Sequence, residues 1–413
     1  MYKLLVFTEL YYPEETSTGY ILTNIFEILA QNHQVEVITS PLADHFQNQD
    51  FLRKKVHNSV DIIRCGGSSL DKNLMLGRMI NILTRTASIF GEGLKRCVQE
   101  NVVFVVTNPP TLPFVVFLIA KLKGCQYILI IHDVYPDVLD VLGYGKWLPG
   151  LNFLWRQVNQ LIYKNATNIV VLGRDMAQRI EQNYLTVDCD QKKLVCIHNW
   201  AELETVFPDD RASNPLLRQL TLNDKFVVLY AGNLGRTHGV EVFAEAMRKL
   251  RDRDDIHFLT IAAGQKRPWL QQFINEHSLS NTTLIPLEDR PRSEQNVSLN
   301  AGDVAIISFI PGMAGISVPS RMYNCMAAGK PILAVADTES ELAQVIVEED
   351  IGWVVTPENV DGLVKTIEYA ASHPQVCAEM GQRAVVAARS KYTFEQAIAG
   401  YRDLLKNLGT EHS

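Results

Sequence analysis

Short runs of consecutive apolar residues alternate along the chain with segments whose apolar positions recur at helical spacing. The runs are rich in β-branched residues and predict strands, whereas segments such as 20–32 and 241–252 repeat apolar residues at i, i+3, i+4 and i+7 and predict amphipathic helices. Because the runs are continuously apolar, the strands are expected to be buried on both faces in parallel sheets. The predicted strands are 4–10, 35–40, 61–65, 102–108, 127–134, 168–172, 194–199, 225–232, 257–264, 282–288, 304–309, 331–336 and 352–357.

The alternation of predicted strands and helices is interrupted once along the chain. Residues 200–225 are polar, contain prolines and include no predicted strand, which is typical of an interdomain linker. A chain of 413 residues is also longer than one core usually supports. We therefore expect an α/β protein with two doubly wound, Rossmann-like parallel-sheet domains facing a central cleft. The predicted domains are residues 1–202 and 203–390, followed by a C-terminal helix at 391–413 that packs back across them.

Composition narrows the class of protein. Hydrophobic residues make up 47% and charged residues 21%, as in ordinary globular proteins. The seven cysteines show no CxxC or Cys/His spacing, so neither a metal site nor a disulfide framework is expected. No apolar run approaches the ~20 residues of a membrane span, and residues 1–10 lack a signal-peptide pattern. The sequence predicts a cytoplasmic protein that does not bind nucleic acid.

A candidate anion site lies at residues 316–337. Pro319 and Ser320 predict a helix start, and Gly329 predicts its end. Free N–H groups at the helix start attract anions, and Arg321 adds a positive charge there. Asn324 lies one turn further along the same face, so it could reach a ribose hydroxyl attached to that anion. The alternative is that Ser320 only caps the helix and Arg321 is solvated.

Two more strand-to-helix turns carry glycine and a basic residue. In the first, Gly232 and Gly235 allow a tight turn before Arg236. In the second, Gly264 ends a strand and Lys266 follows it. Glycines permit close backbone approach, and a nearby cation suits a diphosphate. Three such turns in one half of the chain predict that the second domain binds a nucleotide-linked anion, although a single glycine-rich turn is often only a connector.

The first half carries two further candidate segments. Ser17, Thr18 and Gly19 follow the first predicted strand at the start of a helix, where they would face the cleft. His132 and Asp133 lie at the end of a buried strand, and a carboxylate there is a candidate base or a partner for a sugar hydroxyl. The alternative for these two is a structural histidine and a helix cap.

The first half also contains a basic stretch. Residues 51–100 hold nine Lys or Arg residues and four acidic ones. Within residues 72–96 the basic side chains alternate with apolar ones, as in a helix that lies on a membrane surface. A core helix with solvated basic residues is an equally good interpretation of this pattern.

Taken together, five segments resemble one enzyme family. The segments are YYPEETSTGY (11–20), HDVYPDVL (132–139), CIHNW (196–200), YAGNLGRTHGVE (230–241) and VPSRMYNCMAAGKPIL (318–333). They resemble the retaining GT-B glycosyltransferases of family 4, in the branch that builds bacterial exopolysaccharide and O-antigen units, such as colanic acid fucosyltransferase-like and N-acetylfucosamine transferase-like enzymes. The resemblance covers essentially the whole chain.

The resemblance implies a role for each domain. The second domain would hold a nucleoside diphosphate sugar without a metal or other cofactor, and the first would hold the acceptor. The implied donor-binding residues are Gly232, Asn233, Gly235, Arg236, Lys266, Ser320, Arg321 and Asn324. The chain departs from the family pattern at Ile316 and Asn324, where family members carry two glutamates, and at Asn233 and His238, where they carry Arg and Lys.

The function that follows is transfer of a hexosyl-type sugar, with retention, from a nucleoside diphosphate sugar to a saccharide acceptor that is linked to a lipid. Asp133 or His132 would orient the attacking hydroxyl. The setting would be bacterial cell-surface polysaccharide biosynthesis at the inner face of the cytoplasmic membrane, with membrane contact through residues 72–96. Two alternatives remain: a nucleotide-sugar 2-epimerase on the same fold, and a non-catalytic sugar-nucleotide-binding protein, which the missing glutamates would suit.

Overall fold

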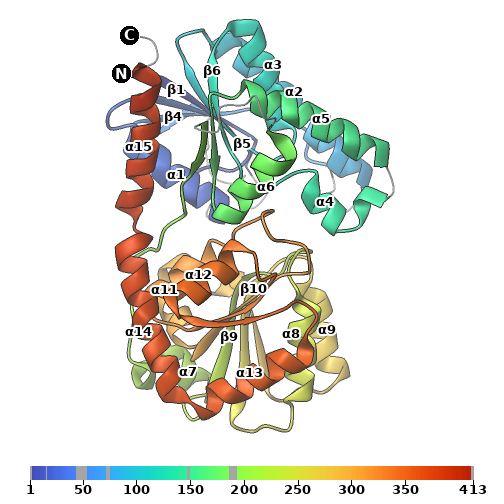
Figure 1. Cartoon of the computed structure of the whole chain (residues 1–413), viewed down its shortest axis with the longest axis vertical. Helices are drawn as coiled ribbons and strands as arrows, with labels where there is room; N and C mark the ends of the chain where they lie inside the picture. Colours follow the sequence, from blue (N-terminus) through green and yellow to red (C-terminus); the bar gives the residue numbers. More distant parts are fainter. Residues whose placement is uncertain are drawn as a thin grey trace. The chain divides into compact units, whose positions relative to one another are not determined.

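The computed structural model describes residues 2–14, 16–42, 54–70, 75–146, 149–185 and 193–410. The chain divides into two compact units (Figure 1). Unit 1 comprises Met1–Asp137, Lys146–Ile197 and Ile398–Ser413, and unit 2 comprises Val138–Gly145 and His198–Ala397. The domain boundary at residue 202 and the C-terminal segment from residue 391 stay predictions.

Unit 1 is built on a sheet of eight strands, in the order β3-β4-β2-β1-β5-β6-β7-β8. The strands pair in parallel, except that β3 runs antiparallel to β4 at the edge. Their bounds are β1 Lys3–Thr8, β2 Gln34–Thr39, β3 Lys54–His57, β4 Val60–Arg64, β5 Val102–Val106, β6 Gln126–Ile130, β7 Asn168–Val171 and β8 Leu194–Cys196. The helices are α1 Ser17–Leu29, α2 Met75–Arg96, α3 Leu112–Lys123, α4 Asp137–Val141, which continues into unit 2, α5 Pro149–Asn165 and α6 Arg174–Tyr184.

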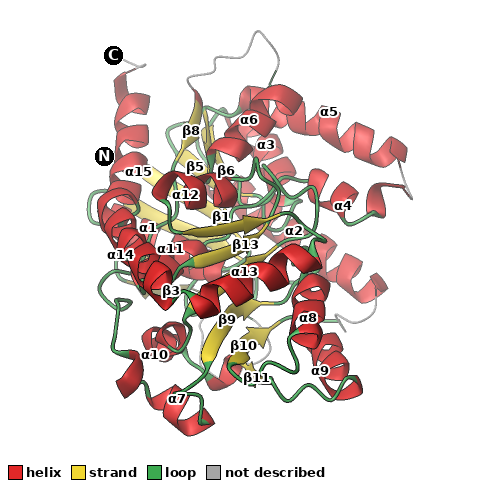
Figure 2. Cartoon of the chain, turned by 60° about the horizontal axis from the view of Figure 1, so that its bottom comes forward, coloured by secondary structure: helices red, strands yellow, loops and turns green. Residues whose placement is uncertain are grey.

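Unit 2 is built on a parallel sheet of six strands, in the order β11-β10-β9-β12-β13-β14 (Figure 2). The strands are β9 Phe226–Asn233, β10 Ile256–Ala263, β11 Thr282–Pro286, β12 Val304–Ser308, β13 Ile332–Val335 and β14 Gly352–Val355. The helices are α7 Pro215–Leu220, α8 Val240–Lys249, α9 Arg267–Glu276, α10 Gln295–Asn300, α11 Arg321–Ala327, α12 Glu341–Glu349, α13 Val360–Ser372 and α14 Pro374–Lys391. Helix α15 (Phe394–Thr410) begins in unit 2 and continues in unit 1.

All thirteen predicted strands are present, and the predicted class of two doubly wound α/β domains is confirmed. The additional strand is β3, whose sequence Lys-Lys-Val-His contains one apolar residue and lacks the continuous apolar run used to find the others. Charged residues are common on edge strands because they discourage pairing with other chains. Within the described residues, every helix is too short or too polar to span a lipid bilayer.

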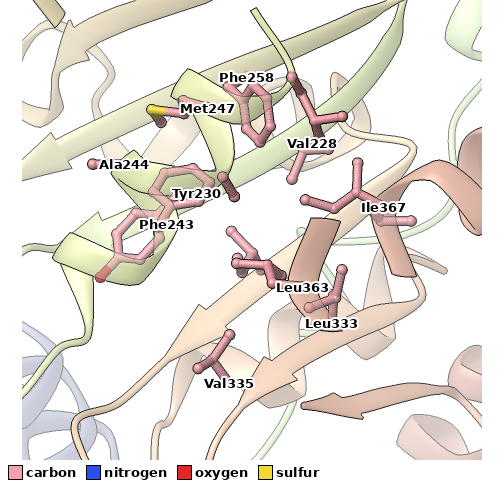
Figure 3. Packing of buried hydrophobic residues seen from close by; sticks show 14 of the residues in the cluster. Val228, Tyr230, Phe243, Ala244, Met247, Phe258, Leu333, Val335, Leu363 and Ile367 are labelled. Atoms are coloured by element: carbon pink, nitrogen blue, oxygen red, sulfur yellow. The ribbon is translucent and has the colours of Figure 1, made fainter. Parts of the chain in front are cut away.

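The core of unit 2 brings the sheet and its helices together around three aromatic rings (Figure 3). The ring centroids of Tyr230 on β9 and Phe243 on α8 lie 5.8 Å apart. Phe243 also packs edge-on against Phe258 of β10, with 5.6 Å between their ring centroids. All three side chains are fully buried. Such aromatic contacts stabilise the unit beyond the burial of their area. They also fix the carboxyl ends of β9 and β10, from which the candidate donor site begins.

Candidate active site

The donor side of the candidate site begins where β9 ends. Gly232 has φ +139°, a conformation that L-residues with side chains rarely adopt. A Cβ atom at this position would lie 3.1 Å from Nη1 of Arg321, so the absence of a side chain leaves room for that guanidinium. The Arg321 guanidinium carbon lies 4.5 Å from the centroid of the Tyr230 ring, a cation–π contact. Core packing of Tyr230 therefore positions the charge of Arg321 beside the turn.

One nitrogen of the Arg321 guanidinium has no hydrogen-bond partner among the described residues. Its Nη2 atom is buried and makes no hydrogen bond to any described residue. A buried N–H donor without a partner costs free energy, and natural structures hold few of them. A guanidinium is suited to bidentate binding of phosphate. An unpaired, positively charged donor beside a glycine turn is the geometry of an anion site.

His238 lies beside the same turn and is held in its neutral form. Burial, followed by the positive charges of Arg321 and Lys266, lowers the pKa of His238 to about 3. Its Nδ1 accepts a hydrogen bond of 3.0 Å from the Gly235 backbone N–H, and its ring stacks on Phe309. Because Nδ1 is the acceptor, the proton of the neutral ring lies on Nε2, which makes that nitrogen a donor.

The other two basic residues of the predicted site have partners in unit 2. Lys266 Nζ lies 2.8 Å from a carboxylate oxygen of Glu241 and donates a 3.0 Å hydrogen bond to the His238 carbonyl. Arg236 donates through Nε to Gln265 at 2.8 Å and through Nη1 to the Tyr144 hydroxyl. The role of Lys266 and Arg236 in binding a diphosphate stays a prediction. To bind it, each side chain would have to give up one of its present hydrogen-bond or ion-pair partners.

Two glycine turns pack directly against each other. Gly264 has φ +110°, and a Cβ atom there would lie 2.2 Å from Oδ1 of Asn233 and 2.7 Å from the Leu234 carbonyl oxygen. The predicted donor residues Gly232, Asn233, Gly235 and Lys266 therefore come together at the carboxyl ends of β9 and β10. Arg321 reaches the same place from the start of α11.

Helix α11 matches its predicted position, but two of its residues have unexpected surroundings. Ser320 occupies the position before the helix, yet its side chain makes no capping hydrogen bond. Asn324 is buried, and its Oδ1 accepts a 2.9 Å hydrogen bond from the backbone N–H of Glu202. Ile316 is fully buried among apolar residues. The ribose contact of Asn324 stays a prediction, with its amide oxygen already engaged in holding the segment around Glu202.

The acceptor-side residues lie at the start of α1 in unit 1. Thr16 caps this helix by accepting a hydrogen bond from Gly19 N–H, a role that the sequence analysis did not assign. Ser17 is exposed, and Thr18 is half-buried. Gly19 is buried, and a Cβ atom there would lie 2.5 Å from the Glu14 carbonyl oxygen. A glycine is therefore required at this position for the loop to close against the helix.

The loop before α1 is held by a buried arginine that the sequence analysis did not single out. Arg64, at the end of β4, donates to the carbonyl oxygens of Ser40 at 3.1 Å, Tyr11 at 3.4 Å and Tyr12. Burial lowers the pKa of Arg64 from its usual value, against the opposing charge of Glu14. Only the fold of unit 1 brings these three segments together, so no local sequence signal could have identified Arg64.

The two predicted catalytic residues follow β6. The backbone N–H groups of His132 and Asp133 both donate to the Thr107 hydroxyl, at 3.1 and 3.3 Å. Burial lowers the pKa of His132 to about 4, so its imidazole is neutral at pH 7. Its Nε2 is buried and has no hydrogen-bond partner among the described residues. A neutral imidazole with one unsatisfied nitrogen can exchange a hydrogen bond with a hydroxyl group.

The loop that carries these residues is anchored at Asp137. This carboxylate is 1% exposed and lies 2.7 Å from Arg179 Nε, 2.9 Å from Arg156 Nη2 and 2.7 Å from the Tyr184 hydroxyl. Burial alone would raise the pKa of Asp137, but the hydrogen bonds from Tyr184 and Arg179 outweigh it and hold the pKa below its usual value. The segment between His132 and Asp137 is thus fixed by a buried ion-pair network. The described residues contain no group of three or more His, Cys, Asp or Glu side chains arranged to hold a metal ion.

Comparisons with known proteins identify the family. The family model of glycosyl transferases group 1 matches residues 215–386. The probable glycosyltransferase WbjE of Pseudomonas aeruginosa is 31% identical over 300 residues, which cover 72% of this chain and 73% of that protein. The putative colanic acid biosynthesis glycosyl transferase WcaI of Escherichia coli K12 is 26% identical over 399 residues, 92% of this chain and 96% of that one.

A solved structure supports the fold. That of Anabaena HepE in complex with UDP and glucose superposes with a TM-score of 0.71 at 13% identity, over 99% of this chain and 100% of that one. The GT-B fold predicted from the sequence is confirmed. The chain belongs to the glycosyl transferases group 1 family and is a glycosyltransferase.

Proposed function

We propose that this chain transfers a hexosyl-type sugar, with retention at the anomeric carbon, from a nucleoside diphosphate sugar to a lipid-linked saccharide during assembly of a bacterial cell-surface polysaccharide. The observation that carries the proposal is the buried Nη2 of Arg321 beside the Gly232 turn, which makes no hydrogen bond to a described residue. Such a donor fits one oxygen of a diphosphate. The UDP bound in the HepE structure and the colanic acid pathway named for WcaI support the same class of substrate and product.

In the proposed reaction, the bond between the anomeric carbon and the diphosphate oxygen breaks, and the acceptor hydroxyl oxygen forms the new bond. Negative charge develops on the departing diphosphate, where Arg321 and the Nε2–H of His238 would stabilise it. Preorganised donors aimed at developing charge usually supply the largest single contribution to catalysis. No metal or other cofactor is part of this proposal.

The acceptor would be activated from unit 1. Its hydroxyl loses a proton as the new bond forms, and the Asp133 carboxylate or the His132 imidazole would orient that hydroxyl and accept the proton. Neutral His132 has the free nitrogen for this role. Contact with the cytoplasmic face of a membrane, through residues 72–96, belongs to the same proposal because a lipid-linked acceptor is held at a bilayer.

A donor-hydrolysis and transfer assay tests the proposal. Nucleoside diphosphate sugars are incubated with the full chain, with and without lipid-linked saccharide, and released nucleotide and new glycan are quantified. Arg321→Ala should lower kcat/KM by about 10²–10³, the usual loss when one charge-stabilising donor is removed. Arg251→Ala is the matched control, since Arg251 is an exposed arginine of unit 2. Equal activity in Arg321→Ala and the control would contradict the proposal.

The products distinguish the remaining alternatives. A nucleotide-sugar 2-epimerase would convert the donor without releasing nucleotide and without needing an acceptor. A protein that binds donor but neither hydrolyses nor transfers it would match the loss of both family glutamates, at Ile316 and Asn324. Either result would replace the proposed transfer.

A further inference from the structure

We propose that helices α2, α3 and α5 of unit 1 together form a docking surface for an anionic lipid bilayer. The proposal rests on the proposed function only in that a lipid-linked acceptor gives the docking its purpose. The surface extends beyond the basic stretch at 72–96, because two of its three helices lie elsewhere in the sequence.

The first half of α2 turns its apolar face outward. Leu76, Met79, Ile80 and Leu83 recur at i, i+3, i+4 and i+7, and they are 73%, 50%, 42% and 62% exposed. A stripe with this spacing normally faces the core of a globular protein. Here it is the polar Asn81 that is buried, with its amide bonded to the N–H and C=O of Leu70 at 2.9 and 2.8 Å. Among the described residues, the packing of α2 thus leaves its apolar stripe exposed.

Helices α3 and α5 continue this pattern. Leu118 and Leu122, one turn apart on α3, are 51% and 68% exposed. On α5, Leu151, Leu154 and Leu161 share one face and are all more than half exposed. Of the 21 exposed large hydrophobic residues in the described part of the chain, 11 lie on these three helices. Exposed apolar side chains in such concentration mark an interaction surface.

The three helices belong to one layer. They follow β4, β5 and β6 and lead to β5, β6 and β7, so all three connections cross the sheet in the same direction. Right-handed crossovers in one direction place the helices on one face of a sheet. Helix α3 contacts both α2 and α5, and Figure 1 shows the three grouped on one side of unit 1. The three helices therefore lie side by side in one layer.

The charge of this layer selects an anionic bilayer as the occupant. The three helices carry eight Lys or Arg residues and a single acidic residue, Glu92, which is buried, although the whole chain has a net charge of −7. Four of the eight, Arg85, Lys95, Arg96 and Arg156, pair with carboxylates. Lys121, Lys123 and Lys164 make no ion pair with a described residue, so their charge is available to lipid headgroups. Apolar side chains interspersed with basic ones are typical of helices that bind anionic lipid surfaces. A second copy of this chain would place two basic faces against each other, which disfavours a symmetric dimer here.

Helix α5 links this surface to the candidate catalytic loop. On its inward side, Trp155 stacks on Tyr135, Asn159 donates to the Tyr135 carbonyl oxygen at 2.7 Å, and Arg156 pairs with Asp137. Leu154 and Leu161 of the same helix are exposed. Docking through α5 would therefore hold the segment from His132 to Asp137, which packs on this helix, close to the lipid.

Vesicle flotation with the full chain tests the docking surface. Vesicles of phosphatidylcholine alone and of phosphatidylcholine mixed with phosphatidylglycerol are compared at low and high salt. We expect partition onto the anionic vesicles that weakens with salt. Changing Leu151 and Leu154 to Gln, or Leu76 and Leu83 to Gln, should reduce partition at least tenfold, because each exposed leucine loses its buried area in the lipid. Lys121→Gln and Lys164→Gln should each reduce it about fivefold.

Matched controls separate the surface from general effects. Val347→Gln with Val386→Gln removes two exposed apolar side chains of unit 2, and Lys406→Gln removes an exposed charge of α15. These variants should partition like the unmodified chain, and thermal unfolding should show that all variants are folded. Absence of partition at low salt, undiminished partition of the leucine variants, or a dimer that the leucine variants dissociate would each overturn the proposal.

The same experiment separates this proposal from the proposed function. Donor hydrolysis in the absence of lipid measures unit 2 chemistry without requiring docking. Partition without hydrolysis or transfer would leave the docking surface standing and overturn the transferase mechanism. Donor hydrolysis without partition onto vesicles would overturn the docking surface and leave the transferase mechanism standing.

Discussion

The guanidinium carbon of Arg321 lies 4.5 Å from the centroid of the Tyr230 ring, while the Nη2 atom of the same side chain has no hydrogen-bond partner among the described residues. Tyr230 is part of the buried core of unit 2. A core residue thus holds a charged group in place with one donor still unpaired. The proposed mechanism depends on this arrangement, because a cation that is already in place stabilises the leaving diphosphate without having to move during the reaction.

Gly232→Ala should weaken donor binding at least tenfold. The new Cβ atom would lie 3.1 Å from Arg321 Nη1, and the φ of +139° is unfavourable for alanine by roughly 1–3 kcal/mol. Gly91→Ala is the control, since a Cβ atom there meets nothing within 4 Å. Calorimetric titration with UDP and thermal unfolding measure the two effects. Unchanged affinity in Gly232→Ala would show that the Arg321 position does not control binding.

The free energy of unfolding should fall as the pH drops below about 6.5. The pKa of buried His238 is about 3 in the folded chain, so the unfolded chain binds a proton first and is favoured in this range. Each such histidine contributes up to about 1.4 kcal/mol per pH unit, and His132 acts in the same direction. Between about pH 7.5 and pH 5, the free energy of unfolding measured in urea should fall less steeply with pH for His238→Asn than for the unmodified chain. An identical slope would mean that His238 is not buried in its neutral form.

Asp137→Asn should destabilise the chain by about 3–5 kcal/mol, because it leaves the positive charges of Arg156 and Arg179 without their buried partner. Asp252→Asn, at a carboxylate that is 90% exposed, should change stability by less than about 0.5 kcal/mol. Urea unfolding of both variants gives the comparison. Equal stabilities would remove Asp137 as the anchor of the loop after His132.

Arg64→Gln should raise the KM for the acceptor and leave donor hydrolysis unchanged. The guanidinium holds the backbone of Tyr11 and Tyr12, in the loop that leads to Ser17 and Gly19. Losing a charged hydrogen bond of this kind costs about 1.5–3 kcal/mol, which loosens the loop without touching unit 2. Steady-state kinetics with each substrate varied in turn provide the measurement. A parallel loss of donor hydrolysis would assign Arg64 a general structural role instead.

The strands and the glycine turns could be predicted from the sequence because their signals are local. Continuous apolar runs identify buried parallel strands, and Gly232 and Gly264 both adopt the positive φ that a tight turn needs. The edge strand β3 was missed because only one of its four residues, Val56, is apolar. A search for continuous apolar runs does not detect such a strand.

The partners of individual side chains could not be predicted, because they come from distant parts of the chain. Asn324 was expected at a ribose, yet its Oδ1 binds the backbone of Glu202, 122 residues away. Lys266 was expected to be available for a diphosphate, but it pairs with Glu241. The contact of Arg321 with Tyr230 also joins distant segments and gave no signal in the sequence. Such tertiary contacts decide which candidate residues are available to a ligand.

A crystal structure of the chain with UDP shows whether Arg321 binds the diphosphate. We expect the diphosphate to lie beside the Gly232 turn, with one oxygen accepting a hydrogen bond from Nη2 of Arg321. A diphosphate that binds elsewhere and makes no hydrogen bond to Nη2 would rule out Arg321 as the anion-binding group.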